Sequence, residues 1–180
     1  MSSARTGLLI RDLRPGDSQD LIDAYYSYYR ELADNTAFGL ALYRTKPSYG
    51  SELEWFSHLY RDFEAGNCVA KVAVVRGRIV GMCNVTRQRP GSETDHVGEL
   101  GIAVRSGYRN MGIGRKLMAS AISACKGRFE AIQLSVFAVN YAAIRLYRSV
   151  GFVRWGTLPR AVRRGRRYFD QDLMFLDLRG

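Results

Sequence analysis

A glycine-rich segment between a β-rich run and an amphipathic stretch carries the clearest chemical signal in this sequence. In the β-rich run, residues 97–104, alternation puts Glu99 on one face with Gly101 and Ala103, so little side-chain bulk surrounds the carboxylate. The next segment, residues 109–114, opens a helix, whose free N–H groups and positive dipole end can hold a phosphate. We therefore predict an anion-binding turn close to a carboxylate that can serve as a general base.

Two familiar phosphate loops do not fit this turn. A nucleotide-binding P-loop requires Gly-Lys followed by Ser or Thr, but Gly114 is followed by Arg115 and Lys116, so the magnesium-binding hydroxyl is missing. A dinucleotide fingerprint that began at Gly112 would require a small third residue where Leu117 stands. The turn therefore belongs to neither class.

A second constellation lies about 30 residues further along the chain. After a nearly continuous apolar run, Asn140 is typical of a helix N-cap, and Ala143 and Tyr147 follow at the i+3 and i+7 positions of the same helical face. A phenol such as Tyr147 can act as a general acid. Two interpretations stay open here, since Asn140 can be a cap and nothing more, and Tyr147 can be a packing residue.

Taken together, the two segments resemble the GNAT superfamily of acetyl-CoA-dependent N-acetyltransferases. The family signature Arg/Gln-x-x-Gly-x-Gly/Ala is matched by Arg109, Gly112 and Gly114. The later segment Asn-x-x-Ala-x-x-x-Tyr-x-x-x-Gly-Phe, which begins at Asn140, is similar to the family's second cofactor-binding region. The resemblance covers about residues 97–152. It implies an α/β, GNAT-like acyl-CoA N-acyltransferase fold, with a mixed, mainly antiparallel sheet flanked by helices.

The same resemblance implies a cofactor site. The strand before the signature would bind the pantetheine arm of acetyl-CoA through its backbone, and the loop amides would hold the pyrophosphate. The later helix would lie near the pantetheine and the acetyl thioester. The residues implied for cofactor binding are Ile102, Ala103, Val104, Arg109, Asn110, Met111, Gly112, Ile113, Gly114, Arg115, Asn140, Ala143 and Tyr147.

The implied reaction is direct attack of a neutral primary amine on the thioester carbonyl, without a metal. We assign Glu99 as the general base, acting directly or through water, against the alternative that it is a solvated strand carboxylate. Tyr147 is assigned as the acid, because a phenol of pKa about 10 can protonate a departing thiolate of pKa about 8.5. Deprotonation at pH 7 costs a lysine about 4.6 kcal/mol and a terminal α-amine about 1 kcal/mol.

The acceptor is less well defined by the sequence. Residues 154–167 contain six arginines and no acid, and the chain carries a formal charge of +10. This charge suits a protein lysine or a protein N-terminus better than a cationic small molecule. A small-molecule amine is the alternative acceptor, and a non-catalytic module that binds acyl-CoA or nucleic acid is the alternative function. The arginines can also form a solvated loop, or contact the 3′-phosphate of CoA.

Composition adds further limits. The 180 residues are 47% apolar, which is enough for one domain over residues 1–180 with its own core. The three cysteines form no C-x-x-C pair, so we expect no disulfide framework, no metal site, and a reducing cytoplasmic compartment. Residues 1–7 lack the apolar core of a signal peptide, and no apolar stretch approaches the ~18 residues of a membrane span. We expect a soluble protein with no membrane partner.

The elements that must position these residues alternate along the chain. The expected strands cover residues 8–14, 68–75, 79–86, 97–104, 131–139, 152–158 and 168–178. The expected helices cover residues 17–32, 51–64, 112–126 and 140–150. Four tyrosines between positions 25 and 29 lie on the first helix, where they can form an aromatic wall for the acceptor or pack in the core or a homodimer interface.

Overall fold

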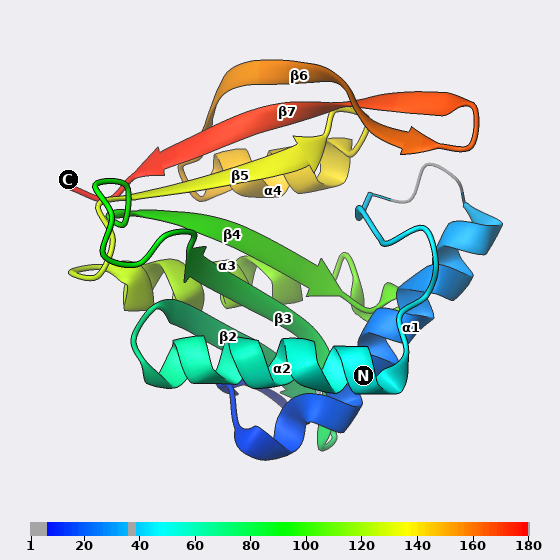
Figure 1. Ribbon diagram of the computed structural model, residues 1–180, viewed down its shortest axis with the longest axis horizontal. Coiled ribbons are helices and arrows are strands. Elements are labelled where there is room, and N and C mark those ends of the chain that lie inside the picture. The colour runs from blue at the N-terminus through cyan, green and yellow to red at the C-terminus, as the bar shows by residue number, and fades with distance from the viewer. Residues whose placement is uncertain (1–6, 36–38, 180) are drawn as a thin grey trace, which may run out of the picture.

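The computed structural model describes residues 7–35 and 39–179, and its elements alternate in the expected order (Figure 1). The strands are β1 (Leu8–Asp12), β2 (Cys68–Val75), β3 (Arg78–Arg87), β4 (Val97–Val104), β5 (Ala131–Phe137), β6 (Val153–Arg164) and β7 (Arg167–Asp177). The helices are α1 (Ser18–Asp34), α2 (Tyr49–Glu64), α3 (Ile113–Cys125) and α4 (Tyr141–Ser149), with short 3₁₀ turns at Pro15–Asp17 and Ser106–Tyr108.

All seven strands form one sheet in the order β1-β2-β3-β4-β5-β7-β6. Only the β4–β5 pair is parallel, and every other neighbouring pair is antiparallel. The expectation of a mixed, mainly antiparallel sheet is therefore confirmed. The parallel pair requires a crossover, which α3 supplies between β4 and β5.

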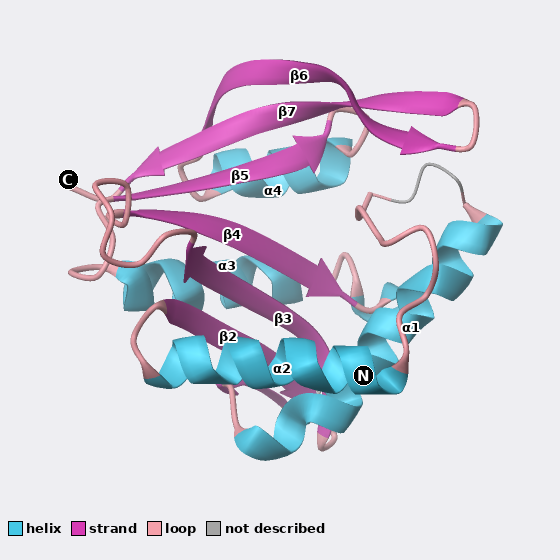
Figure 2. Cartoon of the chain, viewed as in Figure 1, coloured by secondary structure: helices cyan, strands magenta, loops and turns pink. Residues whose placement is uncertain are grey.

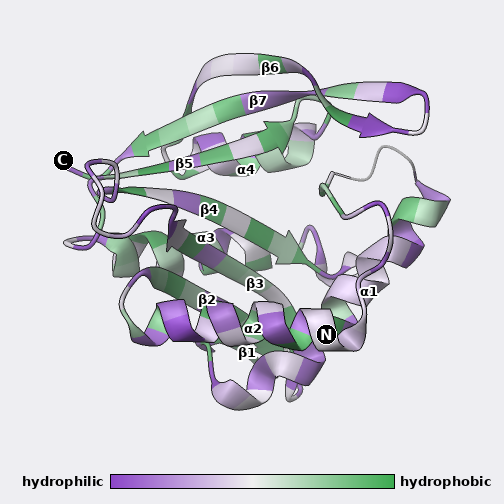
Figure 3. Cartoon of the chain, viewed as in Figure 1, coloured by the Kyte–Doolittle hydropathy of each residue, from purple (hydrophilic) through white to green (hydrophobic). Residues whose placement is uncertain are grey.

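Helices cover both faces of the sheet (Figure 2). On one face, α3 and α4 pack through side chains such as Leu117, Met118 and Ile144 into the larger core cluster. On the other face, α1 and α2 contribute Leu21 and Phe56 to a second cluster over β2 and β3. Figure 3 shows the hydrophobic colour concentrated on the central strands, while the tip of the β6–β7 hairpin is hydrophilic. Burial on two faces explains why β2 is a nearly continuous apolar run. Strand β5 differs from the apolar run expected there, because Gln133 and the exposed Ser135 lie on a face that the second cluster does not cover.

Local sequence explains where several elements begin and end. The β2–β3 hairpin turns at Arg76 and Gly77, which have φ angles of 50° and 77°. Positive φ at both central residues is the geometry of the tight hairpin turn that matches the twist of the two strands. Strand β6 is the clearest difference from expectation, because it continues past Leu158 to Arg164. A register shift between Leu158 and Val162 allows this strand to bend and continue.

Several expectations are not tested by this fold. The statement about the chain start concerns residues 1–6, which lie outside the described residues. That residues 1–180 form one domain, that the compartment is cytoplasmic and that the chain dimerises stay predictions. Within residues 7–35 and 39–179, no helix is long and apolar enough to cross a membrane. Over the same ranges, no group of three or more His, Cys, Asp or Glu side chains could hold a metal ion.

Candidate active site

The two parallel strands separate soon after they meet. Residues Val97–Glu99 of β4 pair with Ala131–Gln133 of β5, and in the described chain the ladder between them ends there. Beyond this point β4 and β5 diverge toward their carboxyl ends (Figure 1). The rest of β4 keeps its antiparallel partner β3 on one side only. Its other edge therefore offers backbone N–H and C=O groups to a bound molecule.

A cavity of about 380 Å³, here called the β4–α4 cavity, lies beside this free edge. Three segments meet there, namely the end of β4, the turn into α3, and the first two turns of α4. Its lining residues are Ile102, Ala103, Val104, Arg109, Asn110, Gly112, Gly114, Arg115, Asn140, Ala142, Ala143, Leu146 and Tyr147. The structure thus brings together most of the residues that the sequence assigns to a cofactor.

The amino-terminal end of α3 is open toward an anion. Gly112 occupies the N-cap position with φ 77° and provides no side chain to cap the helix. Asn110 also has a positive φ of 61°, a conformation that asparagine tolerates better than most residues. The first N–H groups of the helix have no intrahelical partner and carry the positive end of the dipole. No acidic residue lies in this first turn, so nothing there competes with a bound phosphate.

Gly114 allows three elements to approach closely. A Cβ atom built at this position would lie 3.1 Å from Cδ2 of Leu146 on α4 and 4.0 Å from Cδ1 of Ile102 on β4. A side chain here would force the tip of Leu146 to move by a few tenths of an ångström. The second glycine of the signature therefore has a packing reason as well as a binding one.

Arg109 does not direct its guanidinium freely into the cavity. Its Nη1 and Nη2 atoms donate to the two carboxylate oxygens of Glu31 on α1, at 2.5 and 3.1 Å. Its Nε atom donates to the Val104 carbonyl at 2.7 Å. The two-pronged ion pair is the strong, geometrically specific kind. Arg109 therefore fastens the turn before α3 to α1 and to the end of β4, a role that the residue types alone did not indicate.

Asn140 both caps α4 and lines the cavity. Its Oδ1 accepts a hydrogen bond from the backbone N–H of Ala143 at 3.2 Å, as a helix cap does. A Cβ atom at Gly39 would clash with Nδ2 of Asn140, at 2.2 Å, so the loop before α2 passes directly against this side chain. The cap interpretation is thus supported without excluding a contact to a ligand.

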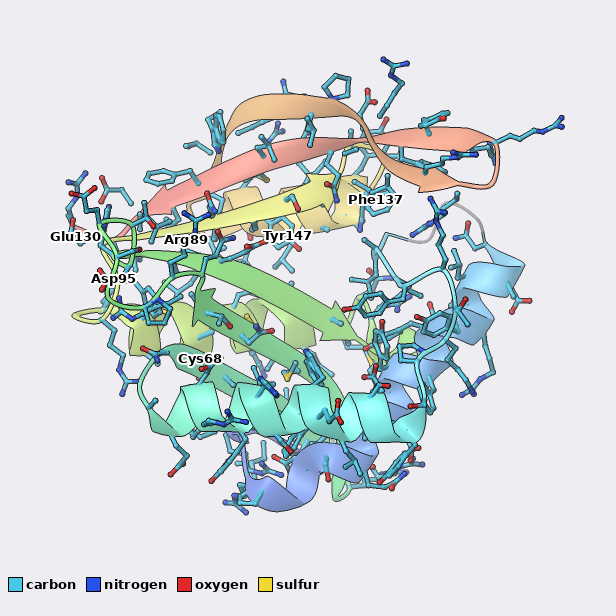
Figure 4. The ribbon with its side chains drawn as sticks, viewed as in Figure 1. Cys68, Arg89, Asp95, Glu130, Phe137 and Tyr147 are labelled. Carbon is cyan, nitrogen blue, oxygen red and sulfur yellow. The ribbon has the colours of Figure 1, made fainter. Side chains whose placement is uncertain are left out.

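Tyr147 is buried, with 7% of its surface exposed, and its ring lies 6.0 Å from that of Phe152. Figure 4 shows Tyr147 beside the place where β4 and β5 separate. Burial raises the pKa of its phenol above the ordinary value, and the nearby Cys83 thiol adds to the effect. The phenol therefore stays protonated at neutral pH, and no hydrogen bond to its hydroxyl is present among the described residues.

Glu99 lies in a different place. It is exposed on β4, accepts a hydrogen bond from Nε2 of Gln88, and lines a hollow of about 310 Å³ with Asn84 and Thr86. It is not among the residues that line the β4–α4 cavity. Glu99 also lines a hollow of about 300 Å³ with Gln133 and Ser135 of β5. The two candidate catalytic side chains therefore line different hollows.

Two assigned residues do not line the cavity with the others. The side chain of Met111 is exposed to solvent, and that of Ile113 is buried in the core beneath α3. Only their backbone N–H groups remain relevant to an anion. Conversely, Ala142 and Leu146 line the cavity although the sequence analysis did not select them. Their spacing was the available signal, because Ala142 and Leu146 are four positions apart and share one face of α4.

The tyrosines of α1 organise the loop before α2. The hydroxyl of Tyr26 donates to the Pro47 carbonyl at 3.0 Å, and that of Tyr29 donates to the Tyr43 carbonyl at 3.2 Å. Tyr28 is buried, whereas Tyr25 lines a surface cavity together with Glu52 and Trp55. Packing within the chain therefore accounts for most of this cluster.

The arginines near the chain end form the hairpin rather than a free loop. Arg164 donates to the Leu40 carbonyl, and its guanidinium lies 4.8 Å from the ring centre of Phe137, which Figure 4 marks at the end of β5. Arg154 pairs with the buried carboxylate of Asp172 at 3.4 Å. None of the arginines after position 115 lines the β4–α4 cavity.

The cysteines take no part in this site. Cys68, Cys83 and Cys125 are buried free thiols. Burial raises the pKa of each, that of Cys125 to about 12, so they stay protonated at neutral pH. A buried neutral thiol is a poor nucleophile.

Comparisons with known proteins agree with this geometry. The model of the family described as Acetyltransferase (GNAT) family matches residues 21–152. A solved structure, that of ribosomal-protein-alanine N-acetyltransferase from Brucella melitensis, is 30% identical and has a TM-score of 0.79. The match covers 94% of this chain and 99% of that one.

Two curated proteins are similar over shorter stretches. L-amino acid N-acetyltransferase AaaT of Escherichia coli (strain K12) is 35% identical over 57% of this chain and 64% of its own length. N-acetylaspartate synthetase of Xenopus tropicalis is 32% identical over 64% of this chain and 42% of its own length. The chain thus spans less than two thirds of each of these relatives.

Proposed function

The chain belongs to the GNAT acetyltransferase family, and from this premise we propose that it transfers the acetyl group of acetyl-CoA to an α-amine. One observation carries the proposal: the free edge of β4, the open end of α3 and the phenol of Tyr147 converge on one cavity. Backbone groups for an amide-rich arm, N–H groups for a pyrophosphate and a proton donor are the parts that the reaction requires.

For the cosubstrate, we assign the residues by their position in the cavity. The backbone edge at Ile102–Val104 suits the amides of the pantetheine arm, because it lacks a strand partner on that side. The N–H groups from Gly112 to Arg115 suit the pyrophosphate, and the exposed Arg115 adds a positive charge at the rim. Arg109 acts indirectly, by holding this turn against Glu31.

For the chemical step, a neutral amine attacks the thioester carbonyl, and the C–S bond breaks as the amide forms. We assign Tyr147 to donate a proton to the departing sulfur. Burial raises the pKa of its phenol, so the hydroxyl is protonated when the C–S bond breaks, and the thiolate that develops takes this proton. The proton lost by the amine passes to water or to a base on the acceptor side. Glu99 is our candidate for that base, acting through water, because it is an exposed carboxylate on β4 just before the free edge at Ile102–Val104.

We infer the acceptor class from the acceptors that the names of similar proteins give. The three named relatives act, by their names, on an L-amino acid, on aspartate and on a ribosomal-protein alanine. The amine of each such acceptor is an α-amine. Its cost of deprotonation at pH 7 is about 1 kcal/mol for a peptide terminus, against about 4.6 kcal/mol for a lysine side chain. We therefore favour the N-terminus or a free amino acid over a protein lysine.

A free-thiol release assay with acetyl-CoA tests the proposal. The acceptors are free L-amino acids, a peptide with an unblocked N-terminus, and the same peptide with a blocked N-terminus and an internal lysine. We expect turnover with the first two and none with the third. Turnover with the blocked lysine peptide alone would show that the acceptor is a lysine side chain and not an α-amine. No turnover at all, with acetyl-CoA binding confirmed by thermal shift, would favour a non-catalytic acyl-CoA module.

A further inference from the structure

A second cavity, here called the Glu52 cavity, contains a carboxylate that nothing in the proposed reaction uses. It lies between α1, α2 and the loop that joins them, and has a volume of about 580 Å³. Its lining residues are Tyr25, Tyr43, Arg44, Thr45, Pro47, Ser51, Glu52 and Trp55. It shares no lining residue with the β4–α4 cavity.

Glu52 is unusual among the acidic side chains of the described chain. Only 5% of its surface is exposed, and no hydrogen bond or ion pair to its carboxylate is present among residues 7–35 and 39–179. Its oxygens keep some contact with solvent at the cavity, since Arg105 Nε is the one fully enclosed side-chain N or O atom without a hydrogen bond in the described chain. A mostly buried carboxylate without a partner is still costly, so a cation that reaches it is favoured. No further His, Cys, Asp or Glu in the described chain joins it to form a metal-binding group.

Three of the seven other residues that line the Glu52 cavity are aromatic. Tyr25, Tyr43 and Trp55 line the same cavity, and Tyr25 is held in place by an edge-on contact with Tyr29, with ring centres 5.5 Å apart. Aromatic faces attract an organic cation through their negative quadrupole. A carboxylate between aromatic rings is therefore suited to an alkylammonium group, whose charge meets the carboxylate and whose methylene groups contact the rings.

We propose that the Glu52 cavity binds the alkylammonium group of a small molecule, with Glu52 as its counter-ion and Tyr25, Tyr43 and Trp55 as its walls. Arg44 is the one other charged side chain in the lining, and it is exposed and forms no ion pair with Glu52 in the described structure. Its positive charge opposes a bound cation. Affinity therefore depends on direct contact with Glu52 rather than on a general negative potential of the cavity.

Trp55 supplies a direct test, because the chain has only two tryptophans, Trp55 and Trp155. In a Trp155→Phe background, tryptophan fluorescence comes from Trp55 and therefore reports on the Glu52 cavity alone. The protein without acetyl-CoA is titrated with n-butylammonium, with the neutral isostere 1-butanol and with the anion butyrate. We expect a saturable change with butylammonium, and at least about tenfold weaker binding of the other two.

Two substitutions should act in opposite directions. Glu52→Gln keeps the shape of the side chain and should weaken butylammonium binding by at least about tenfold. Arg44→Gln removes the opposing charge and should strengthen it. Glu54→Gln, on the exposed face of the same helix, is the matched control and should leave binding unchanged.

The proposal is overturned if 1-butanol binds as well as butylammonium, because the cavity is then only apolar. It is also overturned if butyrate binds best and loses affinity in Arg44→Gln, because the cavity is then an anion site. Unchanged butylammonium binding in a folded Glu52→Gln protein overturns it as well. None of these outcomes depends on acetyl transfer, so the site can fail or stand independently of the proposed reaction.

Discussion

At the scale of single residues, Tyr147 is the assignment on which the chemistry depends most. It lines the β4–α4 cavity, and burial holds its phenol protonated. We expect Tyr147→Phe to lower kcat by about 10²- to 10⁴-fold, the range for loss of a general acid, with little change in acetyl-CoA affinity. Steady-state kinetics and isothermal titration with acetyl-CoA check this. Equal turnover in the variant would remove Tyr147 from the mechanism.

The packing of Tyr147 provides its control. The phenylalanine ring retains the contact with Phe152, so the melting temperature should stay close to that of the wild type. A variant that loses activity and stability together would indicate a structural role instead.

The burial of Glu52 leads to a separate prediction about how the stability of the fold depends on pH. Burial raises its pKa above the ordinary value of 4.5, so the folded protein binds this proton more tightly than the unfolded chain does. The free energy of unfolding should therefore fall as pH rises from about 4.5 through the raised pKa of Glu52. Above that pKa the loss of stability should remain constant. Glu52→Gln removes this loss and should stabilise the ligand-free protein by about 1 kcal/mol or more at neutral pH.

Thermal unfolding across this pH range measures the effect. The difference between Glu52→Gln and the wild type should be small at the acid end and grow toward neutral pH, while the exposed Glu54→Gln shows no such trend. A destabilised Glu52→Gln protein at neutral pH would mean that the carboxylate has a structural partner.

At the scale of elements, the two glycines that flank helix α3 should differ in function. We expect Gly112 to affect acetyl-CoA binding as well as stability. Gly112 has φ 77° at the amino-terminal end of α3, and Gly127 has φ 76° just beyond its other end. Alanine at either position costs about 1–2 kcal/mol of backbone strain. Neither position has an atom within 4 Å of a built Cβ, so strain is the common penalty.

The two variants should differ in acetyl-CoA binding. Gly112→Ala alters the turn whose N–H groups we assign to the pyrophosphate, so we expect weaker binding by about tenfold or more, while Gly127→Ala binds normally. Calorimetric titration of both proteins, at a temperature where both are folded, compares them. If both variants bind acetyl-CoA with equal affinity, the turn at Gly112 does not take part in cosubstrate binding.

The observed element boundaries agree with the expected ones where a single residue type controls the backbone. The spans of β2 and β4 agree with those expected, and Asn140 caps α4 as its type suggests. Strand β6 was longer than expected, since a register shift carries it past Leu158 to the arginines. Such a bend depends on pairing with β7, which residue types along β6 alone do not reveal.

At the scale of the whole molecule, the carboxyl-terminal hairpin is joined to the loop between α1 and α2. Arg164 reaches the Leu40 carbonyl and stacks on Phe137 and Phe169. Arg164→Gln should therefore speed amide hydrogen exchange in residues 39–47 several-fold, without altering acetyl-CoA affinity. Exchange followed by mass spectrometry measures this, with the exposed Arg166→Gln as the control. Unchanged exchange in Arg164→Gln would show that the loop is held by its tyrosine contacts alone.

The sequence by itself determined the family resemblance, the glycine turn before α3 and the cap of α4. These features depend on local backbone preferences, such as the positive φ of Gly112, and residue types specify them directly. Only the tertiary structure decided that Arg109 binds Glu31, 78 positions away, and that Glu99 lies apart from the β4–α4 cavity. It also decided that Glu52 is buried among aromatic side chains. Contacts of this kind depend on how α1, α2 and the sheet pack, and no periodicity within one segment encodes that arrangement.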